Sequence, residues 1–265
     1  MGHSPRTRPC PLCAGTARGL LFCRDSWDVV ECASCSMVYL AQEIPYSTQL
    51  DEHEFADSYV REHQRRKQKH PLLLAISGRT RKLKPEIGDR LLAQTLRWWP
   101  AAKGGKLLDF GCGDGKFLEK AAQYFAVTGV EISPRLAQMA AARVPGARII
   151  RAPITEAALP AGAFDVVTQF SVLEHEWRPL DALRAAHRAL APAGITVLKV
   201  PNHASWNRHI MRADWCGYRL PDHCNYFTPR TLAAMLRSAG FTPLPGSLFD
   251  RFPTSDSLWM AARKM

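Results

Sequence analysis

Four cysteines stand in two close pairs near the start of the chain. The pairs are CPLC, with Cys10 and Cys13, and CASC, with Cys32 and Cys35, and eighteen residues separate them. A Cys-x-x-Cys turn aims two thiolates at one point, and two such turns at this separation complete the tetrahedral sulfur shell that structural Zn²⁺ prefers. This shell has no open position, so we assign it to folding rather than to catalysis. Cys23 lies between the pairs, and we expect it to be packed rather than ligating.

A second chemical signal is the stretch LLDFGCGDGKFLE at 107–119. An apolar run reaches Asp109, is broken by alternating glycines and then becomes helical. Gly111 and Gly113 match the dinucleotide-binding pattern GxGxxG, but Lys116 occupies its third glycine position. A carboxylate at Asp109 would repel a pyrophosphate, whereas it can attract a cationic ligand. The loop therefore indicates a nucleotide-like ligand that carries positive charge.

Glu131 ends the next predicted strand, twenty residues after Gly111. An acidic side chain at this place can accept hydrogen bonds from both hydroxyls of a ribose. Asp109 or Glu131 alone could be an exposed acid at a strand end. The loop and the two carboxylates together favour a ligand-binding site.

Repeated strand, turn and helix patterns position these residues. The apolar segments KLLDF, VTGVEI, ARII, FDVVTQF and ITVLKV alternate with helical segments from residue 105 onward. This alternation predicts a parallel sheet with helices on both faces and a ligand beyond the carboxyl ends of its strands. We divide the chain into a cysteine module at 1–40, a helical connector at 41–103 and an α/β domain at 104–265. Residues 201–227 are predicted to form a cap over the substrate side of that domain.

The motifs LLDFGCGDGKFLE, VTGVEIS, FDVVTQFSVLEH and LAPAGITVLKVPN resemble, in this order, those of class I S-adenosylmethionine-dependent methyltransferases. The resemblance covers about 105–263. CPLC…CASC followed by MVYL resembles a bacterial subgroup in which a zinc ribbon precedes the methyltransferase domain. The resemblance implies a Rossmann-like seven-stranded sheet with helices on both faces.

The same resemblance assigns residues to the cofactor. The methionine part would contact the loop, at Asp109, Gly111, Cys112 and Gly113. Glu131 would hold the ribose, and Ile132 would pack on the adenine. Gln169 and Phe170 would line the cofactor at the end of the fourth strand. Cys112 is expected to pack rather than to react. Ala152 and Pro153 stand where relatives often carry the aspartate that binds the adenine amine, so Glu156 or a backbone carbonyl would have to replace it.

Two histidines are candidates for removing a proton from the methyl acceptor, because histidine titrates near neutral pH. His175, in SVLEHEW, should face the methyl end of the cofactor, although it could instead cap a helix or bond a loop. His223, in LPDHCNYFTPRTL, precedes a helix capped by Thr228. Sugar C-methyltransferases with a zinc ribbon carry an acid and a histidine in a similar segment, which singles out Asp222 and His223. Tyr226 could donate a hydrogen bond or belong to the core.

Composition and charge limit the remaining choices. The 265 residues include 35 basic and 24 acidic side chains, with a basic run between 61 and 86. This run fits a solvated helix face, or a surface for a phosphorylated substrate, RNA or an anionic membrane. No segment is long and apolar enough to span a bilayer, and MGHSPRTRPC lacks the apolar part of a signal peptide, so we expect a cytoplasmic protein without stable membrane insertion.

Our leading hypothesis is methyl transfer from S-adenosylmethionine to an anionic small-molecule or carrier-linked acceptor, with a histidine as general base. A sugar nucleotide, a polysaccharide or a secondary-metabolite precursor would fit. One alternative is an RNA methyltransferase that binds phosphate through the cysteine module and the basic run. Another is a cofactor-binding scaffold without activity. The acceptor atom and the oligomeric state stay open.

Overall fold

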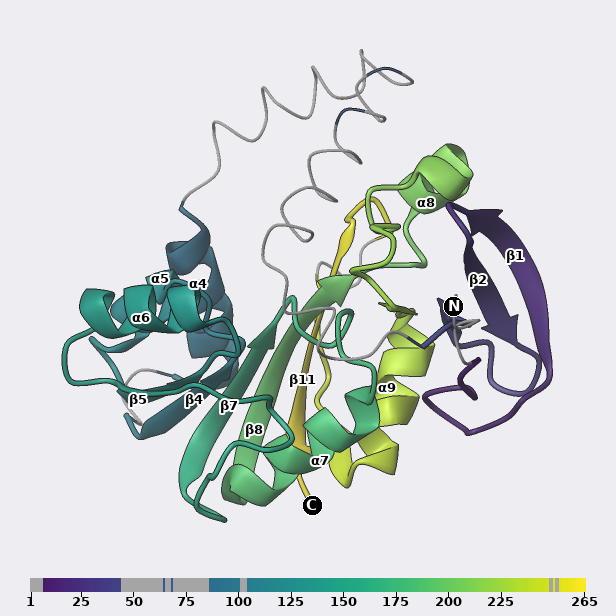
Figure 1. Cartoon of the computed structure of the whole chain (residues 1–265). Helices are drawn as coiled ribbons and strands as arrows, with labels where there is room; N and C mark the ends of the chain where they lie inside the picture. Colours follow the sequence, from purple (N-terminus) through teal and green to yellow (C-terminus); the bar gives the residue numbers. More distant parts are fainter. Residues whose placement is uncertain are drawn as a thin grey trace.

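The computed structural model describes residues 7–43, 64, 68, 86–100, 104–247, 250 and 253–265. Its strands form two sheets, one of seven strands and one of four (Figure 1). Most of the predicted connector at 41–103 and almost all of the basic run between 61 and 86 lie outside the described residues. Among the described residues, no helix combines the length and apolar character needed to cross a bilayer.

The seven-stranded sheet has the order β10-β11-β8-β7-β4-β5-β6. The strands are β4 (Lys106–Phe110), β5 (Ala126–Val130), β6 (Arg148–Ile150), β7 (Phe164–Phe170), β8 (Leu190–Pro201), β10 (Phe241–Pro243) and β11 (Ser257–Lys264). Strands β4 to β8 run parallel, as the alternating pattern predicted. The last two strands run antiparallel, because β11 returns along β8 and β10 pairs with β11. The expected Rossmann-like seven-stranded architecture is confirmed.

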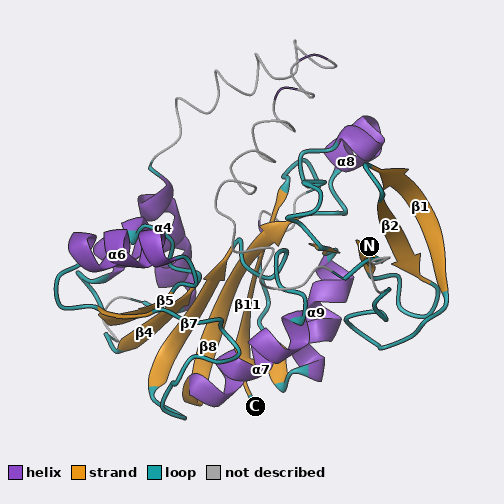
Figure 2. Cartoon of the chain, in the orientation of Figure 1, coloured by secondary structure: helices purple, strands orange, loops and turns teal. Residues whose placement is uncertain are grey.

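Helices cover both faces of this sheet (Figure 2). One group is α4 (Ile87–Trp98), α5 (Lys116–Ala121) and α6 (Pro134–Arg143), and the other is α7 (Pro179–Ala189) and α9 (Pro229–Ser238). The side chains of β4 explain this arrangement, because successive residues of a strand face opposite sides. Leu107 packs in the core that includes Phe117 and Leu118 of α5, whereas Leu108 packs in the core that includes Leu232 and Met235 of α9.

Helix starts follow the capping signals of the sequence. The Ser133 hydroxyl accepts a hydrogen bond from the N–H of Leu136 at the start of α6. At α9, Thr228 caps the helix as predicted; it forms a capping box with Thr231, and Pro229 occupies the first helical turn. These caps hold the helices directly after segments that carry site residues.

The four-stranded sheet joins the start of the chain to the predicted cap. It consists of β1 (Arg18–Arg24), β2 (Trp27–Cys32), β3 (Val38–Leu40) and β9 (Asn225–Tyr226), all antiparallel to their neighbours. The hairpin of β1 and β2 fills the interval between the cysteine pairs. Pairing of β3 with β9 was not predicted, because these strands are far apart in sequence.

Arg8 reinforces this junction from within. Arg8 is 6% exposed, and its guanidinium donates hydrogen bonds to the carbonyls of Leu40 and Trp177, at 2.9 and 3.0 Å, and to Oδ1 of Asn225 at 3.1 Å. These acceptors belong to the cysteine module, to the segment after β7 and to β9. Because burial of an arginine without such partners is costly, Arg8 holds these three segments together.

Candidate active site and cysteine site

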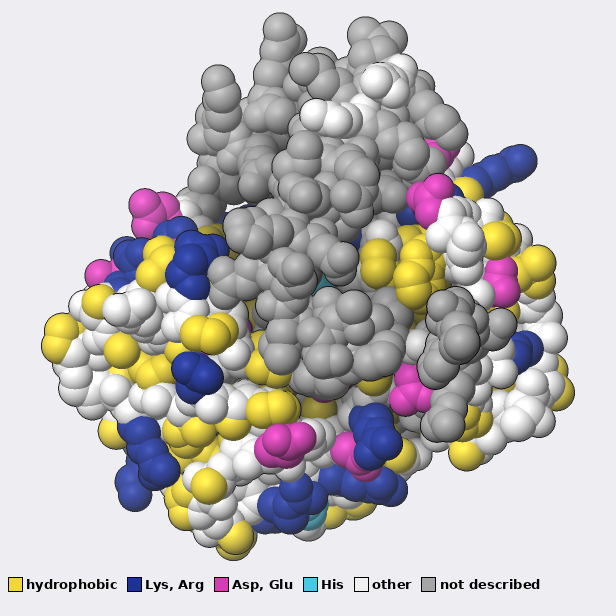
Figure 3. Space-filling view, viewed as in Figure 1, with side chains coloured by type: hydrophobic (Ala, Val, Ile, Leu, Met, Phe, Trp, Pro, Cys, Tyr) yellow, Lys and Arg dark blue, Asp and Glu magenta, His cyan; other side chains and the backbone are white. Residues whose placement is uncertain are grey.

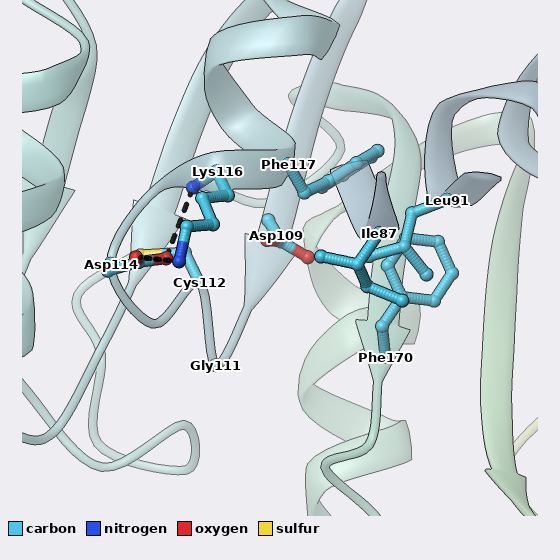
Figure 4. Close-up of a pocket in the computed structure, with 9 residues that line it drawn as sticks. All are labelled: Ile87, Leu91, Asp109, Gly111, Cys112, Asp114, Lys116, Phe117 and Phe170. Carbon is cyan, nitrogen blue, oxygen red and sulfur yellow. Dashed lines mark hydrogen bonds and ion pairs between the residues drawn. The ribbon is translucent and has the colours of Figure 1, made fainter. Parts of the chain in front are cut away.

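Asp109 lies at the carboxyl end of β4 and faces a cavity of about 250 Å³ (Figure 4). The cavity is lined by β4, the following loop and α5, by α4 and by the end of β7; the residues are Ile87, Leu91, Asp109, Gly111, Cys112, Asp114, Lys116, Phe117 and Phe170. The Thr168 hydroxyl donates to Oδ1 of Asp109 at 2.6 Å. Burial raises the pKa of Asp109 to about 7, and the nearby charge of Glu131 adds to this shift. A bound cation would favour the ionised carboxylate.

Glycines of the loop adopt backbone conformations that larger residues avoid. Gly111 has φ of +68°, and an added Cβ would lie 2.7 Å from Cγ2 of Val172. Gly115 has φ of +82°, and its Cβ would lie 2.9 Å from Cα of Ala140 in α6. The loop can therefore bend closely between β7 and α6 only because these positions lack side chains.

Glu131 follows β5 and closes the loop from the other side. Its Oε2 accepts a hydrogen bond from the N–H of Gly113 at 2.8 Å, and its Oε1 accepts one from the N–H of Ser133 at 2.9 Å. A carboxylate oxygen has a further lone pair after one such bond. Both oxygens can thus still accept the vicinal hydroxyls of a ribose, as the sequence analysis expected.

The other predicted cofactor residues surround this loop or support it. Phe170 lines the cavity, with its ring 5.0 Å from that of Phe117 in an edge-to-face contact. Gln169 is fully buried and its side-chain amide donates to the Thr196 hydroxyl at 3.2 Å, so this amide does not line the cavity. Ile132 is half-buried directly after Glu131. Cys112 is buried, and burial raises the pKa of its thiol, which supports the expected packing role.

His175 and His223 come together although they follow different strands. Their ring centroids are 4.7 Å apart, and the rings are nearly perpendicular. Nδ1 of His175 lies 2.9 Å from the carbonyl oxygen of Asp222, and Nδ1 of His223 lies 2.8 Å from that of Gly217. Burial lowers the pKa of His175 to about 4 and that of His223 well below its usual value, and the charge of Arg219 acts in the same direction. Both rings are therefore neutral at pH 7.

Glu174 joins this pair, and the sequence analysis missed it. Its side chain is 1% exposed, and its Oε2 has no hydrogen-bond partner within the described part of the chain. One ligand atom from each of Glu174, His175 and His223 lies within 4.8 Å of the others. Burial raises the pKa of Glu174 to about 7. In the sequence, only its position next to His175 in SVLEHEW could have indicated that Glu174 belongs to this site.

Two other predicted catalytic residues have different surroundings. The Asp222 carboxylate lies 3.4 Å from the Arg219 guanidinium, and it is the backbone carbonyl of Asp222 that contacts His175. Tyr226 is fully buried in β9, and its hydroxyl donates to the carbonyl of His223 at 2.5 Å. Tyr226 thus belongs to the core, which was the alternative interpretation, and it positions His223. We do not retain it as a catalytic residue.

The four cysteine thiols of the N-terminal module gather at one point. The sulfur atoms of Cys10 and Cys35, and those of Cys13 and Cys32, are 3.5 Å apart, and all four lie within 4.8 Å of one another. Tetrahedral thiolates at about 2.3 Å from Zn²⁺ are separated by about 3.8 Å, so the donor set and its spacing fit this ion. Cys23 is exposed on β1, not packed as expected, because its side chain points away from the sheet interface.

Comparisons with known proteins indicate the family of the chain. A family model described as a methyltransferase domain matches residues 76–245. A ubiquinone biosynthesis O-methyltransferase from Cereibacter sphaeroides (strain KD131) is 34% identical over 176 residues, which are 62% of this chain and 70% of that protein.

Two solved structures share the fold. An S-adenosylmethionine-dependent methyltransferase from Mesorhizobium loti has a TM-score of 0.54 at 21% identity, over 64% of this chain and 96% of that one. An amino pentose methyltransferase from Micromonospora echinaspora, solved with S-adenosylmethionine, has a TM-score of 0.53 at 20% identity, over 72% of this chain and 97% of that one.

Proposed function

Because the chain belongs to the class I S-adenosylmethionine-dependent methyltransferases, we propose that it transfers the methyl group of this cofactor to a hydroxyl of a small or carrier-linked acceptor beside His175 and His223. The cofactor supplies an electrophilic methyl group on a positively charged sulfur. The tasks of the protein are to hold the cofactor, to align the acceptor and to remove its proton. The names of the curated relatives, which are O-methyltransferases, support oxygen as the acceptor atom.

Two carboxylates hold the cofactor in this proposal. Asp109 faces the cavity and would attract the cationic methionine part, since a buried carboxylate is stabilised by a nearby positive charge. Glu131 would bind the ribose hydroxyls with its remaining lone pairs. The glycine loop between them brings backbone close to the ligand.

The acceptor would lie between this loop and the histidine pair. Val172, two residues beyond β7, touches the position of Gly111 in the loop, and Glu174 and His175 follow directly. His223 approaches the same point from the predicted cap, held by Tyr226 and by the carbonyl of Gly217. This arrangement supports a neutral imidazole that takes up the proton of the hydroxyl during transfer.

Nearby cationic side chains support an anionic acceptor. Lys199 at the end of β8 donates to the Ser171 hydroxyl at 3.0 Å, and burial lowers its pKa. The charges of Lys199 and Arg219 both act on Glu174. In a partly desolvated site, two such cations favour a phenolate, carboxylate or phosphate on the acceptor.

The meeting of His175 and His223 is the observation that carries this proposal. We expect His175→Gln and His223→Gln to keep the cofactor affinity and to lower kcat by about 10² or more, because a general base contributes at least this much. Calorimetry with S-adenosylmethionine and turnover with a panel of hydroxyl-bearing aromatic, sugar and lipid-linked acceptors would measure both. His209→Gln, at an exposed histidine, is the matched control. Unchanged kcat in both variants would refute the role of the pair.

The described residues on the face drawn in Figure 3 give the RNA alternative no support. On the face drawn in Figure 3, lysine and arginine side chains of the described residues are spread over several places among acidic and apolar ones, not gathered in one patch. A groove for a nucleic-acid backbone needs clustered positive charge. We therefore propose small or carrier-linked acceptors.

A further inference from the structure

Glu174, His175 and His223 bring one carboxylate and two imidazoles to one point. We call these residues the Glu-His-His cluster. Two of its members follow β7, and the third belongs to the segment before β9. One carboxylate and two histidines are a ligand set that proteins use for catalytic zinc and other divalent transition metals.

The two histidines are oriented as metal ligands usually are. Each ring has its Nδ1 within hydrogen-bond distance of a backbone carbonyl, Asp222 for His175 and Gly217 for His223. A carbonyl only accepts, so Nδ1 carries the proton and donates it, and the lone pair of each neutral ring lies on Nε2. Such a bond from the other ring nitrogen fixes the tautomer and orientation of most metal-binding histidines.

Glu174 supplies the second, independent observation. Its side chain is almost completely buried, yet Oε2 has no hydrogen-bond partner among the residues that the structure describes. A buried carboxylate oxygen without a partner is costly, and a cation bound between it and the two rings would remove that cost. Nothing in the proposed histidine-base mechanism uses this oxygen.

We propose that the Glu-His-His cluster binds a divalent transition-metal cation, with Zn²⁺ as the best match, beside the methyl acceptor. Tetrahedral ligand atoms at about 2.1 Å from one ion are about 3.4 Å apart, so ligand atoms that now lie within 4.8 Å of one another would approach by at most about 1.4 Å. Three protein ligands leave a position open for the hydroxyl of the acceptor.

The position of the acceptor rests on the proposed function, whereas binding of the ion does not. When the hydroxyl oxygen bonds to the ion, its O–H bond breaks more readily and the proton passes to water. In the chain that holds this ion, His175 and His223 are ligands and water takes up the proton; the histidine base of the proposed function describes the chain without the ion. Lys199 and Arg219 repel a cation here, although Asp222 offsets the charge of Arg219, so the cluster should bind more weakly than the four cysteines.

Metal titration of the whole chain tests the inference. Protein with zinc already bound at the four cysteines is titrated with Zn²⁺ by calorimetry and with Co²⁺ by absorption spectroscopy. We expect one further ion per chain, with cobalt ligand-field bands but without the thiolate charge-transfer absorption of a cysteine site. Glu174→Gln and His175→Gln should weaken this binding at least tenfold, and His209→Gln should not change it. Thermal melting and cofactor affinity report whether each variant is folded.

The outcomes separate this inference from the proposed function. Absence of a further ion, or an ion bound equally well by Glu174→Gln, His175→Gln and the unmodified chain, would overturn the metal site. Full methyl transfer by protein that holds zinc at the four cysteines only would overturn the role of this ion beside the acceptor and would leave the histidine base in place. A bound ion together with turnover that ignores both histidines would instead refute the proposed function.

Discussion

Asp109 is a buried carboxylate, and we expect its protonation to be linked to the binding of the cationic cofactor. Burial raises its pKa from 3.8 to about 7 in the cofactor-free protein. The folded protein therefore binds this proton more tightly than the unfolded chain does. The resulting stability is fully present below pH 3.8 and is lost as the pH rises through 7. At pH 8 the ionised side chain lowers the free energy of unfolding by at most about 4 kcal/mol.

Asp109→Asn should thus stabilise the cofactor-free protein at pH 8 and have little effect on stability near pH 3.8. The amide can still accept the hydrogen bond from Thr168 but carries no charge. The same variant should bind S-adenosylmethionine much more weakly. Denaturant unfolding at the two pH values and calorimetry would measure these effects. Asp181→Asn, at a partly exposed position in α7, should show no comparable pH-dependent gain.

Cofactor affinity of the unmodified protein should also decrease as the pH falls below 7. The cationic ligand requires the ionised form of Asp109, so the bound proton must leave first, and the affinity approaches a tenfold loss per pH unit. Asp109→Asn should remove this dependence. An equal pH dependence in both proteins would show that Asp109 does not bind the cationic part.

At the scale of elements, the passage from β4 into α5 depends on Gly115. This residue has φ of +82° at the start of α5, where no side chain caps the helix. Its missing Cβ would also collide with the backbone of α6. The glycine loop after β4 therefore depends both on the left-handed backbone of Gly115 and on the close approach of α5 to α6.

We expect Gly115→Ala to lower the free energy of unfolding by more than the 1–3 kcal/mol or so that a strained backbone residue costs. It should also weaken cofactor binding. Gly146→Ala is the matched control, because Gly146 has φ of +102° but nothing lies within 4 Å of its added Cβ. Denaturant unfolding of both variants would measure the difference. Equal losses would mean that contact with α6 contributes nothing.

At the scale of the whole molecule, the four-stranded sheet connects the cysteine site to the segment that carries His223. Cys32 ends β2, β2 pairs with β3, and β3 pairs with β9, which follows His223 by one residue. Arg8 connects the same segments through three buried acceptors. The glycine loop after β4, which would hold the cofactor, is instead built on the seven-stranded sheet. A metal at the cysteines should therefore stabilise the segment around His223, beside the proposed acceptor, and not the glycine loop that would hold the cofactor.

Cys32→Ser, or removal of zinc from the cysteines by a chelator, should lower turnover strongly while cofactor affinity stays within about twofold. Hydrogen exchange should become faster in 218–227, because loss of a structural metal unfolds the segments that it joins. Cys23→Ser is the matched control, since this cysteine is exposed and outside the cluster. If cofactor affinity fell together with turnover, the cysteine site would also stabilise the glycine loop, and this prediction would be wrong.

Features with a local cause were predictable from the chain alone. The bend after Asp109, the cap at Thr228, the two Cys-x-x-Cys turns and the alternation of strands and helices each depend on residues close in sequence. Hydrophobic periodicity, left-handed glycines and capping side chains act over a few residues, so the spacing of residues in the sequence predicts them. The family resemblance assigned Glu131 and Phe170 to the cofactor from their positions in short motifs, which are also local.

Other features arise only where distant segments meet. The pairing of β3 with β9, the contact of His175 with His223 and the burial of Tyr226 join residues from separate parts of the chain. No local pattern encodes which neighbour a strand takes or whether a hydroxyl reaches solvent, because long-range packing decides both. The unpartnered oxygen of Glu174 is of this kind. Burial, and not residue type, turns that carboxylate from an ordinary polar side chain into a candidate ligand.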